Sequence, residues 1–384
     1  MGRIAVIVPV HNGGTDLEKC LAAISQSSLP VHECIVVDDA STDDAALRLS
    51  ATPGVRLVRL DTRRGPAYAR NAGASRAEAE VLLFVDADVR VHPDAIAIAA
   101  EQLAADPELT AVFGSYDDRP VRPDFVSRYR NLFHHWVHQS GNIDSASFWS
   151  GCGAIRRAVF RDLGGFDPGY VHPGIEDIEL GARLRRAGFR VRLEKSMLCT
   201  HMKRWTLPNL FKTDLFHRGV PWFRLLLREK YVPRDLNLKF SARLATLFAG
   251  LLCLVAAWML LSGRGDDIWP AAAFLIAAAV CGMLNQWDAG SRLKSIAAIS
   301  LVLVAAWAGF HLAPSLLSLV PLMLILALVL THLPFYRFLA GLHGLSFAIA
   351  AVPMQLLFFL TCALSIPLGL AAHLFKAGGV PGVR

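Results

Sequence analysis

The apolar residues of this 384-residue chain are distributed unevenly, and this break constrains the fold more than any single motif. Charged residues are spread through the first 237 positions, whereas the rest consists largely of long runs of Leu, Ala, Val and Ile. A helix needs about 20 mostly apolar residues to cross a bilayer. We therefore expect a soluble domain at residues 1–237 and an all-α transmembrane domain at residues 238–384. Four or five spans fit the apolar runs at 240–262, 268–284, 295–311, 316–331 and about 345–372.

The soluble part alternates strand-like and helix-like segments. "IAVIVPV" (4–10) and "ECIVVDD" (33–39) are apolar, β-branched runs, and between them apolar residues recur at helical spacing. Strand, helix, strand is the pattern of a βαβ unit in a parallel sheet. A helix near 66–79 and a strand at 81–85 continue the pattern. We predict an α/β fold, in which ligands bind beyond the carboxyl ends of the strands.

Aspartates stand at two of these strand ends. Asp38 and Asp39 follow the second strand, and Asp86 and Asp88 follow the strand at 81–85. On an extended segment, residues 86 and 88 point to the same side. Two carboxylates on one side repel each other, and a divalent cation removes that repulsion. Short acidic pairs are also common in solvated turns and as helix caps, so both uses are open at this point.

Composition excludes several classes of protein. The seven cysteines are scattered and form no Cys-x-x-Cys pair, which argues against disulfides or a zinc site and fits a reducing compartment. A formal net charge of +7 suits anionic partners such as phosphates or lipid head groups. There is no basic-aromatic repeat or nucleic-acid-binding motif, so we expect no nucleic acid partner.

Six short segments of the first 220 residues or so stand out together. They are "VIVPVHNGG" (6–14), "VVDDASTDD" (36–44), "RRGPAYARNAGA" (63–74), "VDADV" (85–89), "GGFDPGY" (164–170) and "EDIELGARLRRAGFRV" (176–191). In this order they resemble the motifs of family 2 inverting glycosyltransferases with the GT-A fold; each motif is weak alone, whereas six in order are specific. The resemblance implies a GT-A nucleotide-diphospho-sugar transferase fold, a nucleotide-diphospho-sugar donor and a Mg²⁺ or Mn²⁺ cofactor.

The resemblance also implies roles for individual residues. Asp86 and Asp88 match the family's metal-binding pair, and His201 is the expected third protein ligand. The cation stabilises the negative charge that grows on the leaving nucleoside diphosphate. The loop from Pro9 to Asn12 is expected to follow the first strand and to form one side of the nucleotide-binding site. The expected donor-binding residues are Pro9, His11, Asn12, Asp39, Arg70, Asp86, Lys203 and Arg204.

A second set of residues concerns the base and the acceptor. Inversion needs a base that deprotonates the acceptor hydroxyl. The resemblance assigns this role to Asp177, with Glu176 as the next candidate, although acidic residues also favour the first turn of any helix. Lys203, Arg204 and Arg218 suit either a phosphate or anchoring at the membrane surface. Trp149 suits either stacking on a sugar or core packing.

The expected function is a membrane-bound inverting glycosyltransferase that moves a sugar to a lipid or lipid-linked acceptor, in cell-envelope polysaccharide or glycolipid biosynthesis. The first alternative is a processive polysaccharide synthase. "HMKRW" has His201 where such synthases have Gln, and the spans are mostly aliphatic, so we predict single-sugar addition. The second alternative is a transporter or receptor with a regulatory nucleotide-binding domain. Spans almost without charge argue against transport.

Charge between the spans predicts the orientation. Arg292, Lys294 and Arg337 lie in segments that we expect to be cytoplasmic loops if the first span leaves the cytosol. Cytoplasmic loops carry an excess of Lys and Arg. We therefore expect an integral membrane protein of a bacterial inner or plasma membrane, with its catalytic domain in the cytosol.

Overall fold

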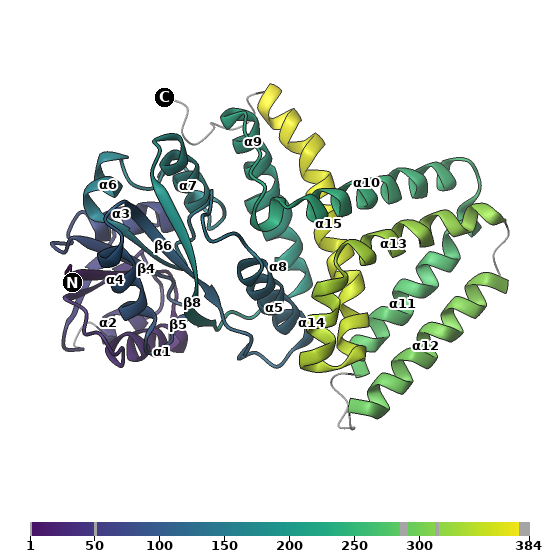
Figure 1. Ribbon diagram of the computed structural model, residues 1–384, viewed down its shortest axis with the longest axis horizontal. Helices are drawn as coiled ribbons and strands as arrows, with labels where there is room; N and C mark the ends of the chain where they lie inside the picture. Colours follow the sequence, from purple (N-terminus) through teal and green to yellow (C-terminus); the bar gives the residue numbers. More distant parts are fainter. Residues whose placement is uncertain (1, 50–51, 285–290, 312–314, 376–384) are drawn as a thin grey trace.

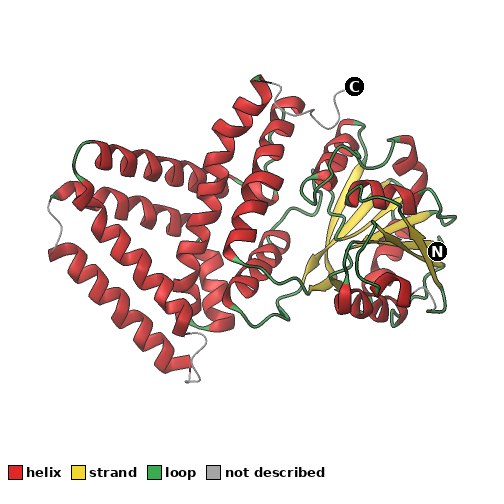
Figure 2. Cartoon of the chain, turned by 180° about the vertical axis from the view of Figure 1, so that it is seen from behind, coloured by secondary structure: helices red, strands yellow, loops and turns green. Residues whose placement is uncertain are grey.

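The computed structural model describes residues 2–49, 52–284, 291–311 and 315–375. It shows a sheet-containing α/β domain beside a group of long helices, with α15 (Leu345–Leu374) running between them (Figure 1). Colouring by secondary structure shows that the strands are confined to the first of these parts (Figure 2). The predicted order of an α/β domain followed by an all-α region is confirmed.

The α/β domain is built on a mixed sheet, which among the described residues has eight strands in the order β3-β2-β1-β4-β7-β6-β8-β5. The pairs β1–β2, β2–β3 and β1–β4 are parallel, as the βαβ pattern predicts. β7 runs antiparallel to both β4 and β6, and β5 runs antiparallel to β8. The strands are β1 Ile4–Val10, β2 Glu33–Asp38, β3 Val55–Arg59, β4 Val81–Val85, β5 Val89–Val91, β6 Leu109–Tyr116, β7 Cys152–Arg156 and β8 Arg190–His201.

Helices cover both faces of this sheet. α1 (Gly14–Ser25) and α4 (Ala95–Ala105) pack in the core on one face. α3 (Pro66–Ala74), α6 (Arg157–Asp162) and α7 (Glu176–Arg186) pack in the core on the other. Strands covered on both faces are expected to be apolar throughout, and every residue of β1 and β4 is buried. The short helix α2 (Ala45–Leu49) lies between β2 and β3 in the chain.

α5 (Phe125–Gln139) joins the α/β domain to the long helices. Its aromatic residues Tyr129 and Phe133 belong to the hydrophobic core of the helical part. The Tyr129 hydroxyl donates to Gln355 Oε1 on α15 at 2.5 Å. Arg130 donates two hydrogen bonds, at 3.0 and 2.6 Å, to the Asp214 carboxylate, and both side chains are 2% exposed. α5 therefore connects the two parts through an apolar core and a buried ion pair.

The helical part contains the candidate spans. By length and composition, three helices of the described residues are able to cross a membrane, namely Phe240–Leu261, Gly265–Gly282 and Leu345–Leu374; counting one bent pair as a span makes four. The helices and short helical turns after β8 are α8 Leu207–Lys212, η1 Thr213–Gly219, α9 Val220–Glu229, η2 Leu236–Leu238, α10 Phe240–Leu261, η3 Gly265–Ile268, α11 Trp269–Leu284, α12 Ser291–His311, η4 Leu316–Ser318, α13 Leu319–Thr331, α14 Leu333–His343 and α15.

Two expectations about the spans need correction. The predicted span at 295–311 lies in α12, whose apolar stretch Leu293–Gly309 is shorter than the others. The run at 316–331 continues into α14 through a 73° bend, because Pro334 at the start of α14 interrupts the helical hydrogen bonds. Lys294 and Arg337 lie within α12 and α14 rather than in loops. The boundary at 237/238 stays a prediction, and α10 begins just after it.

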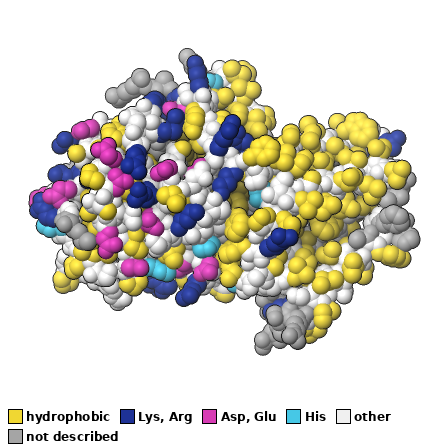
Figure 3. Space-filling model, viewed as in Figure 1, with side chains coloured by type: hydrophobic (Ala, Val, Ile, Leu, Met, Phe, Trp, Pro, Cys, Tyr) yellow, Lys and Arg dark blue, Asp and Glu magenta, His cyan; other side chains and the backbone are white. Residues whose placement is uncertain are grey.

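The surface repeats the division seen in the sequence. In Figure 3, acidic and basic side chains cover the α/β domain, whereas the helical part presents an almost continuous hydrophobic surface. Large exposed side chains on its helices include Leu254, Trp258, Leu303 and Trp307. Apolar patches of this extent are typical of a surface that contacts a membrane or a partner.

The buried pair between α5 and η1 gives a prediction about stability. Asp214→Asn leaves the Arg130 guanidinium buried without its counter-charge, so we expect a loss of about 3–5 kcal/mol in the free energy of unfolding. Asp162→Asn, which removes an exposed ion pair with Arg161, is the matched control and should change little. Thermal unfolding of the full chain in detergent measures both. Equal melting temperatures for the two variants would contradict a structural role of the pair.

Candidate active site

The loops after β1 and β2 are tied together by the side chain of Asn12. Its Oδ1 accepts from the Thr42 backbone amide at 2.8 Å and from the Thr42 hydroxyl at 3.1 Å, and the backbone amide of Asn12 donates to Ser41 Oγ at 2.9 Å. Asn12 adopts a φ of 56°, a conformation that Asn tolerates better than most residues. Pro9, expected in the loop, lies buried inside β1 opposite Val37, so that expected placement is wrong.

Asp39, just after β2, holds the turn that precedes α3. Its carboxylate accepts from the amides of Arg64 at 2.7 Å and Gly65 at 2.8 Å, which fixes the turn that begins α3. The Asp39 carbonyl also contacts His11 Nδ1 at 2.9 Å. Gly65 has a φ of 89°, and a Cβ there would lie 2.3 Å from the Val171 carbonyl oxygen, so only glycine fits. Contact of Asp39, His11, Asn12 or Pro9 with a donor stays a prediction.

Arg70 on α3 connects two carboxylates that are distant in the sequence. Its Nη2 donates to Asp86 Oδ1 at 2.6 Å and its Nη1 donates to Glu176 Oε1 at 2.9 Å. Glu176 Oε2 also accepts from the Gly174 amide at 2.8 Å. Arg70 and Glu176 are both about 3% exposed. The structure therefore shows Arg70 and Glu176 as a buried link, and direct contact of Arg70 with a nucleotide stays a prediction.

Asp88 faces His201 from the turn between β4 and β5. His201 Nε2 lies 3.6 Å from Asp88 Oδ2, and its ring stacks on Tyr116 with centroids 4.6 Å apart. His201 Nδ1 contacts Asn131 Oδ1 at 2.7 Å. Because an amide oxygen only accepts, Nδ1 carries the hydrogen of this bond, and Nε2 is the ring atom that is left to bind a metal. Burial raises the pKa of Asp88, but the facing His201 and Lys203 outweigh it and lower the pKa to about 2.

These residues fit a divalent cation in part. Among the described residues, no three His, Cys, Asp or Glu side chains come close enough to hold a metal, so the expected trio is not assembled as a set. Asp86 and Asp88 keep side chains that are about one third exposed, and the Asp88–His201 pair offers one oxygen and one nitrogen donor. The hydrogen bond from His201 Nδ1 to Asn131 fixes the ring orientation, as such bonds do for metal-binding histidines. The pair is therefore a suitable anchor for Mg²⁺ or Mn²⁺ shared with a donor diphosphate.

Asp177 lies in the first turn of α7 and is held by two neighbouring segments. Its Oδ2 accepts from the amide and the hydroxyl of Ser150 at 3.0 and 3.3 Å, and its Oδ1 accepts from the Ile178 amide at 2.8 Å. Burial and the adjacent Glu176 carboxylate raise the pKa of Asp177 to about 6. A carboxyl group in this range is able to accept a proton near neutral pH. Glu176, in contrast, is fully engaged with Arg70 and Gly174.

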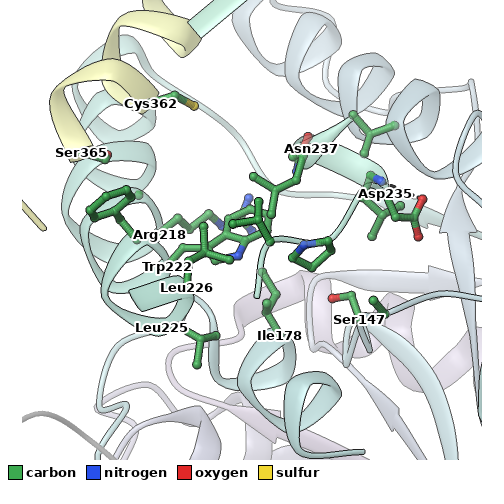
Figure 4. A pocket seen from close by; sticks show the side chains of 18 of the residues that line it. Ser147, Ile178, Arg218, Trp222, Leu225, Leu226, Asp235, Asn237, Cys362 and Ser365 are labelled. Carbon is green, nitrogen blue, oxygen red and sulfur yellow. Dashed lines mark hydrogen bonds between the residues drawn. The ribbon is translucent and has the colours of Figure 1, made fainter. Parts of the chain in front are cut away.

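A pocket of about 380 Å³ begins at Asp177 and continues to α15. Its wall includes Ile178 on α7, Trp222 and Leu226 on α9, and Cys362 on α15 (Figure 4). This volume falls in the range of sites that bind small ligands. The pocket therefore places the candidate base and a candidate membrane span around one cavity. The sequence did not reveal it, because its walls come from five separate segments.

Trp149 lines the same pocket and also packs in the core. Its ring meets Tyr116 edge to face with centroids 4.7 Å apart, and it meets His138 at 5.0 Å. A Cβ on Gly151 would lie 2.4 Å from the Trp149 ring, and one on Gly153 would lie 2.2 Å from the Trp149 carbonyl oxygen. The two glycines thus make room for Trp149. The structure shows the core packing considered for this residue, and stacking on a sugar stays a prediction.

The cations after β8 separate into two groups. Lys203 lies 4.5 Å from the centroid of the Trp205 ring, and Arg204 is exposed. Neither lines the pocket, so their contact with a diphosphate stays a prediction. Arg218 does line the pocket, and its Nη1 donates to His134 Nε2 on α5 at 3.3 Å.

Known families match this architecture. Residues 5–164 match the model of glycosyl transferase family 2, and residues 130–204 match the model described as the N-terminal domain of galactosyltransferase. The mixed sheet with its flanking helices is the GT-A fold of nucleotide-sugar transferases. Residues 5–164 of this chain form a family 2 glycosyltransferase domain.

Curated relatives include two proteins of polysaccharide assembly. The succinoglycan biosynthesis protein ExoA of Rhizobium meliloti is 24% identical over 334 residues, covering 79% of this chain and 93% of its own length. The O-antigen chain rhamnosyltransferase RfbN of Salmonella typhimurium is 25% identical over 58% of this chain and 74% of its own. An uncharacterized glycosyltransferase of Haemophilus influenzae is 24% identical, and the chain spans 55% of its length.

Solved structures show more distant similarity. The mannosyltransferase PcManGT from Pyrobaculum calidifontis, in complex with GDP-Man and Mn²⁺, is 20% identical, with a TM-score of 0.47 over 98% of this chain and 88% of that one. GalNAc-T7 with UDP, GalNAc and Mn²⁺ is 18% identical, with a TM-score of 0.44 over 59% of this chain and 48% of that one.

The two carboxylates at the start of α7 should respond differently to removal of their charge. Asp177→Asn should keep the fold and donor binding but lose turnover by the ~10²–10⁴-fold typical of a missing general base. Glu176→Gln should lower the melting temperature, because the carboxamide still accepts a hydrogen bond but no longer balances the buried charge of Arg70. Steady-state kinetics and thermal unfolding separate the two effects. Normal turnover of Asp177→Asn would move the base elsewhere.

The raised pKa of Asp177 predicts a pH profile. Since a base acts only when deprotonated, and burial raises this pKa to about 6, turnover should fall as the pH drops through about 6 rather than through the ordinary value near 4. The measurement is the turnover rate at saturating donor between pH 5 and 8. A rate that stays constant down to pH 5 would contradict the assignment.

The Asp88–His201 pair predicts how the cation is bound. Asp88→Asn should weaken Mn²⁺-dependent binding of a nucleoside diphosphate by roughly 10–100-fold or more, since it removes a charged ligand. Asp94→Asn, at an exposed aspartate before α4, is the matched control and should bind normally. Isothermal titration of the full chain with and without EDTA measures both. Nucleotide binding that is unaffected by EDTA would exclude a metal-dependent site.

Proposed function

We propose that this protein is a membrane-bound inverting glycosyltransferase that moves a sugar from a nucleoside-diphosphate donor to a lipid or lipid-linked acceptor. The observation that carries the proposal is the pocket, because Asp177 and the candidate span α15 line the same cavity. A transferase for a soluble acceptor has no need of a membrane helix beside its catalytic base. The family 2 domain supports the transfer, and the shared pocket supports the acceptor class.

The donor site is assigned to the carboxyl ends of β1, β2 and β4. Ligands of open α/β sheets bind at this edge, where the loops of Asn12, Asp39 and Asp86 lie. Asp88, His201 and the free oxygen of Asp86 are the residues assigned to Mg²⁺ or Mn²⁺. When bound, such a cation neutralises charge on the diphosphate as it leaves.

The transfer step is assigned to Asp177. Its carboxylate takes the proton of an acceptor hydroxyl while that oxygen bonds to the anomeric carbon of the donor sugar. The bond from this carbon to the diphosphate oxygen breaks, and the electron pair leaves with the nucleoside diphosphate. Attack on the face opposite to the leaving group inverts the anomeric configuration. The Ser150 amide and hydroxyl hold the Asp177 carboxylate in place for this step.

The remaining parts of the proposal concern location and pathway. The four cysteines of the α/β domain, Cys20, Cys34, Cys152 and Cys199, are free thiols, which fits a catalytic domain in the reducing cytosol. The names of RfbN and ExoA refer to O-antigen and succinoglycan, which supports a role in cell-envelope polysaccharide or glycolipid biosynthesis. α10 and α12 are mostly aliphatic, with Trp258 and Trp307 as their single tryptophans, whereas a channel for a sugar polymer needs a polar or aromatic lining. We therefore propose single-sugar addition.

A transfer assay tests the proposal. Membranes that contain the protein are incubated with a panel of radiolabelled sugar nucleotides and total bacterial lipid extract, with membranes that contain Asp177→Asn as the control. We expect one donor to deliver label to the organic phase in a metal-dependent reaction, with the added mass of one sugar. No transfer from any donor would refute the function, and a ladder of chain lengths would instead identify a processive synthase.

A further inference from the structure

The pocket carries an arginine, Arg218, that forms no direct ion pair with a carboxylate of the described residues, although its charge acts on Asp177 from a greater distance. Among the described residues, Arg218 donates to the imidazole of His134, and no acidic side chain lies within ion-pair distance of it. Burial, followed by the nearby Arg130 and Arg218, lowers the pKa of His134 well below its ordinary value, so this partner is neutral at neutral pH. Arg218 is half-buried, which makes an anionic ligand favourable at this position.

The other arginines of the pocket wall are already engaged. Arg130 is paired with Asp214. Arg185 lies 3.8 Å from the centroid of the Tyr231 ring. Arg243 donates to backbone carbonyls of residues 233 and 238. Among the arginines of the described pocket wall, Arg130 and Arg243 therefore have a carboxylate or backbone carbonyls as partners and Arg185 stacks on an aromatic ring, whereas Arg218 contacts the neutral His134 imidazole.

Three further polar atoms of the wall are buried without a hydrogen-bond partner. They are Arg130 Nε, His138 Nδ1 and Asn237 Oδ1. Buried polar atoms in folded proteins are nearly always paired, and a polar ligand in the pocket would complete these hydrogen bonds once a small side-chain shift exposes the atoms. The set includes both a donor and an acceptor. Hydroxyl groups, which donate and accept, match this combination.

Another part of the wall is apolar. Trp222 and Leu226 of α9 and Phe358 and Ile366 of α15 contribute to it. In Figure 4, Arg218 lies beside Trp222 and Leu226, between Ile178, next to the candidate base, and Ser365 of α15. Because α15 is itself a candidate span, its part of this apolar wall suits a hydrocarbon chain.

The segment that carries Arg218 is fixed against α15. Residues Thr213–Gly219 form a π-helix, a rare element that often occurs at functional sites. A Cβ on Gly219 would lie 2.0 Å from Ser365 Oγ, so only glycine allows the two helices to approach this closely. The adjacent Arg218 is thereby held in the pocket wall.

We propose, on the basis of the function proposed above, that this pocket binds a lipid-linked saccharide phosphate. Its sugar hydroxyl lies at Asp177, its phosphate binds Arg218, and its hydrocarbon chain lies against α9 and α15. A bare lipid phosphate is a ligand of this pocket but not an acceptor. A phosphate oxygen is already anionic and needs no base, whereas a base such as Asp177 is required by a neutral hydroxyl.

Binding of radiolabelled hexadecyl phosphate to the full chain in a polyoxyethylene detergent tests the phosphate position. Arg218→Ala should weaken binding by about 10–100-fold, the effect of losing a charged hydrogen bond. Arg161→Ala, at an exposed arginine of α6, should bind as the wild type does. Unlabelled hexadecyl glucoside and inorganic phosphate should both compete poorly. Equal competition by the neutral glucoside would overturn the proposal, as would unchanged binding by Arg218→Ala.

Competition measured on the wild-type protein tests the phosphate position even if Arg218→Ala does not fold. Arg218→Lys is a second variant, which keeps the positive charge but loses the bidentate guanidinium group. In the transfer assay, hexadecyl phosphate should inhibit labelling of the lipid extract without becoming labelled itself. Glycosylation of hexadecyl phosphate would overturn the sugar-hydroxyl part of the proposal. Failure of the proposed transferase function would appear as no transfer of label to any lipid. Failure of the phosphate-binding proposal would appear in the binding measurement, which does not depend on turnover.

Discussion

The site depends on one buried cation, Arg70. Its two Nη atoms hold Asp86, at the end of β4, and Glu176, at the start of α7, although these residues are 90 positions apart in the chain. Burial alone lowers the pKa of Arg70, but the carboxylates of Asp86 and Glu176 outweigh it and raise the pKa. An arginine in this setting stays charged, and breaking a buried pair costs far more than an exposed one. Arg70 therefore fixes the position of the candidate base relative to the strand ends where the donor is proposed to bind.

A second constraint is the helix α5, whose side chains contact three different parts of the molecule. Asn131 orients His201, and His134 receives a hydrogen bond from Arg218 in the pocket. Tyr129 and Phe133 pack into the core of the long helices. A single helix thus links the candidate cation site, the pocket and the membrane-type part. This arrangement explains how a sheet-based transferase domain is held rigidly against helices that have the composition of membrane spans.

The sequence predicted those features that depend on local patterns. The alternation of apolar runs predicted the parallel strands β1, β2 and β4, and the length of the apolar runs predicted α10 and α15. Local patterns carry no information about distant partners. The contact of Arg70 with Glu176, the antiparallel strand β7 and the shared pocket all join segments far apart in the chain, so none was foreseen. The bend between α13 and α14 was missed because hydropathy does not register the effect of Pro334 on helix direction.

The central claim is that donor and acceptor meet at Asp177, between the sheet edge and α15. Cryo-electron microscopy of Asp177→Asn protein with Mn²⁺, a nucleoside diphosphate and total lipid extract tests this most directly. We expect the nucleotide at the ends of β1, β2 and β4, with its diphosphate near Asp88, and elongated density that extends from residue 177 past Arg218 to α15. A nucleotide bound elsewhere, or lipid density confined to the outer faces of the helices with none in the pocket, would contradict the claim.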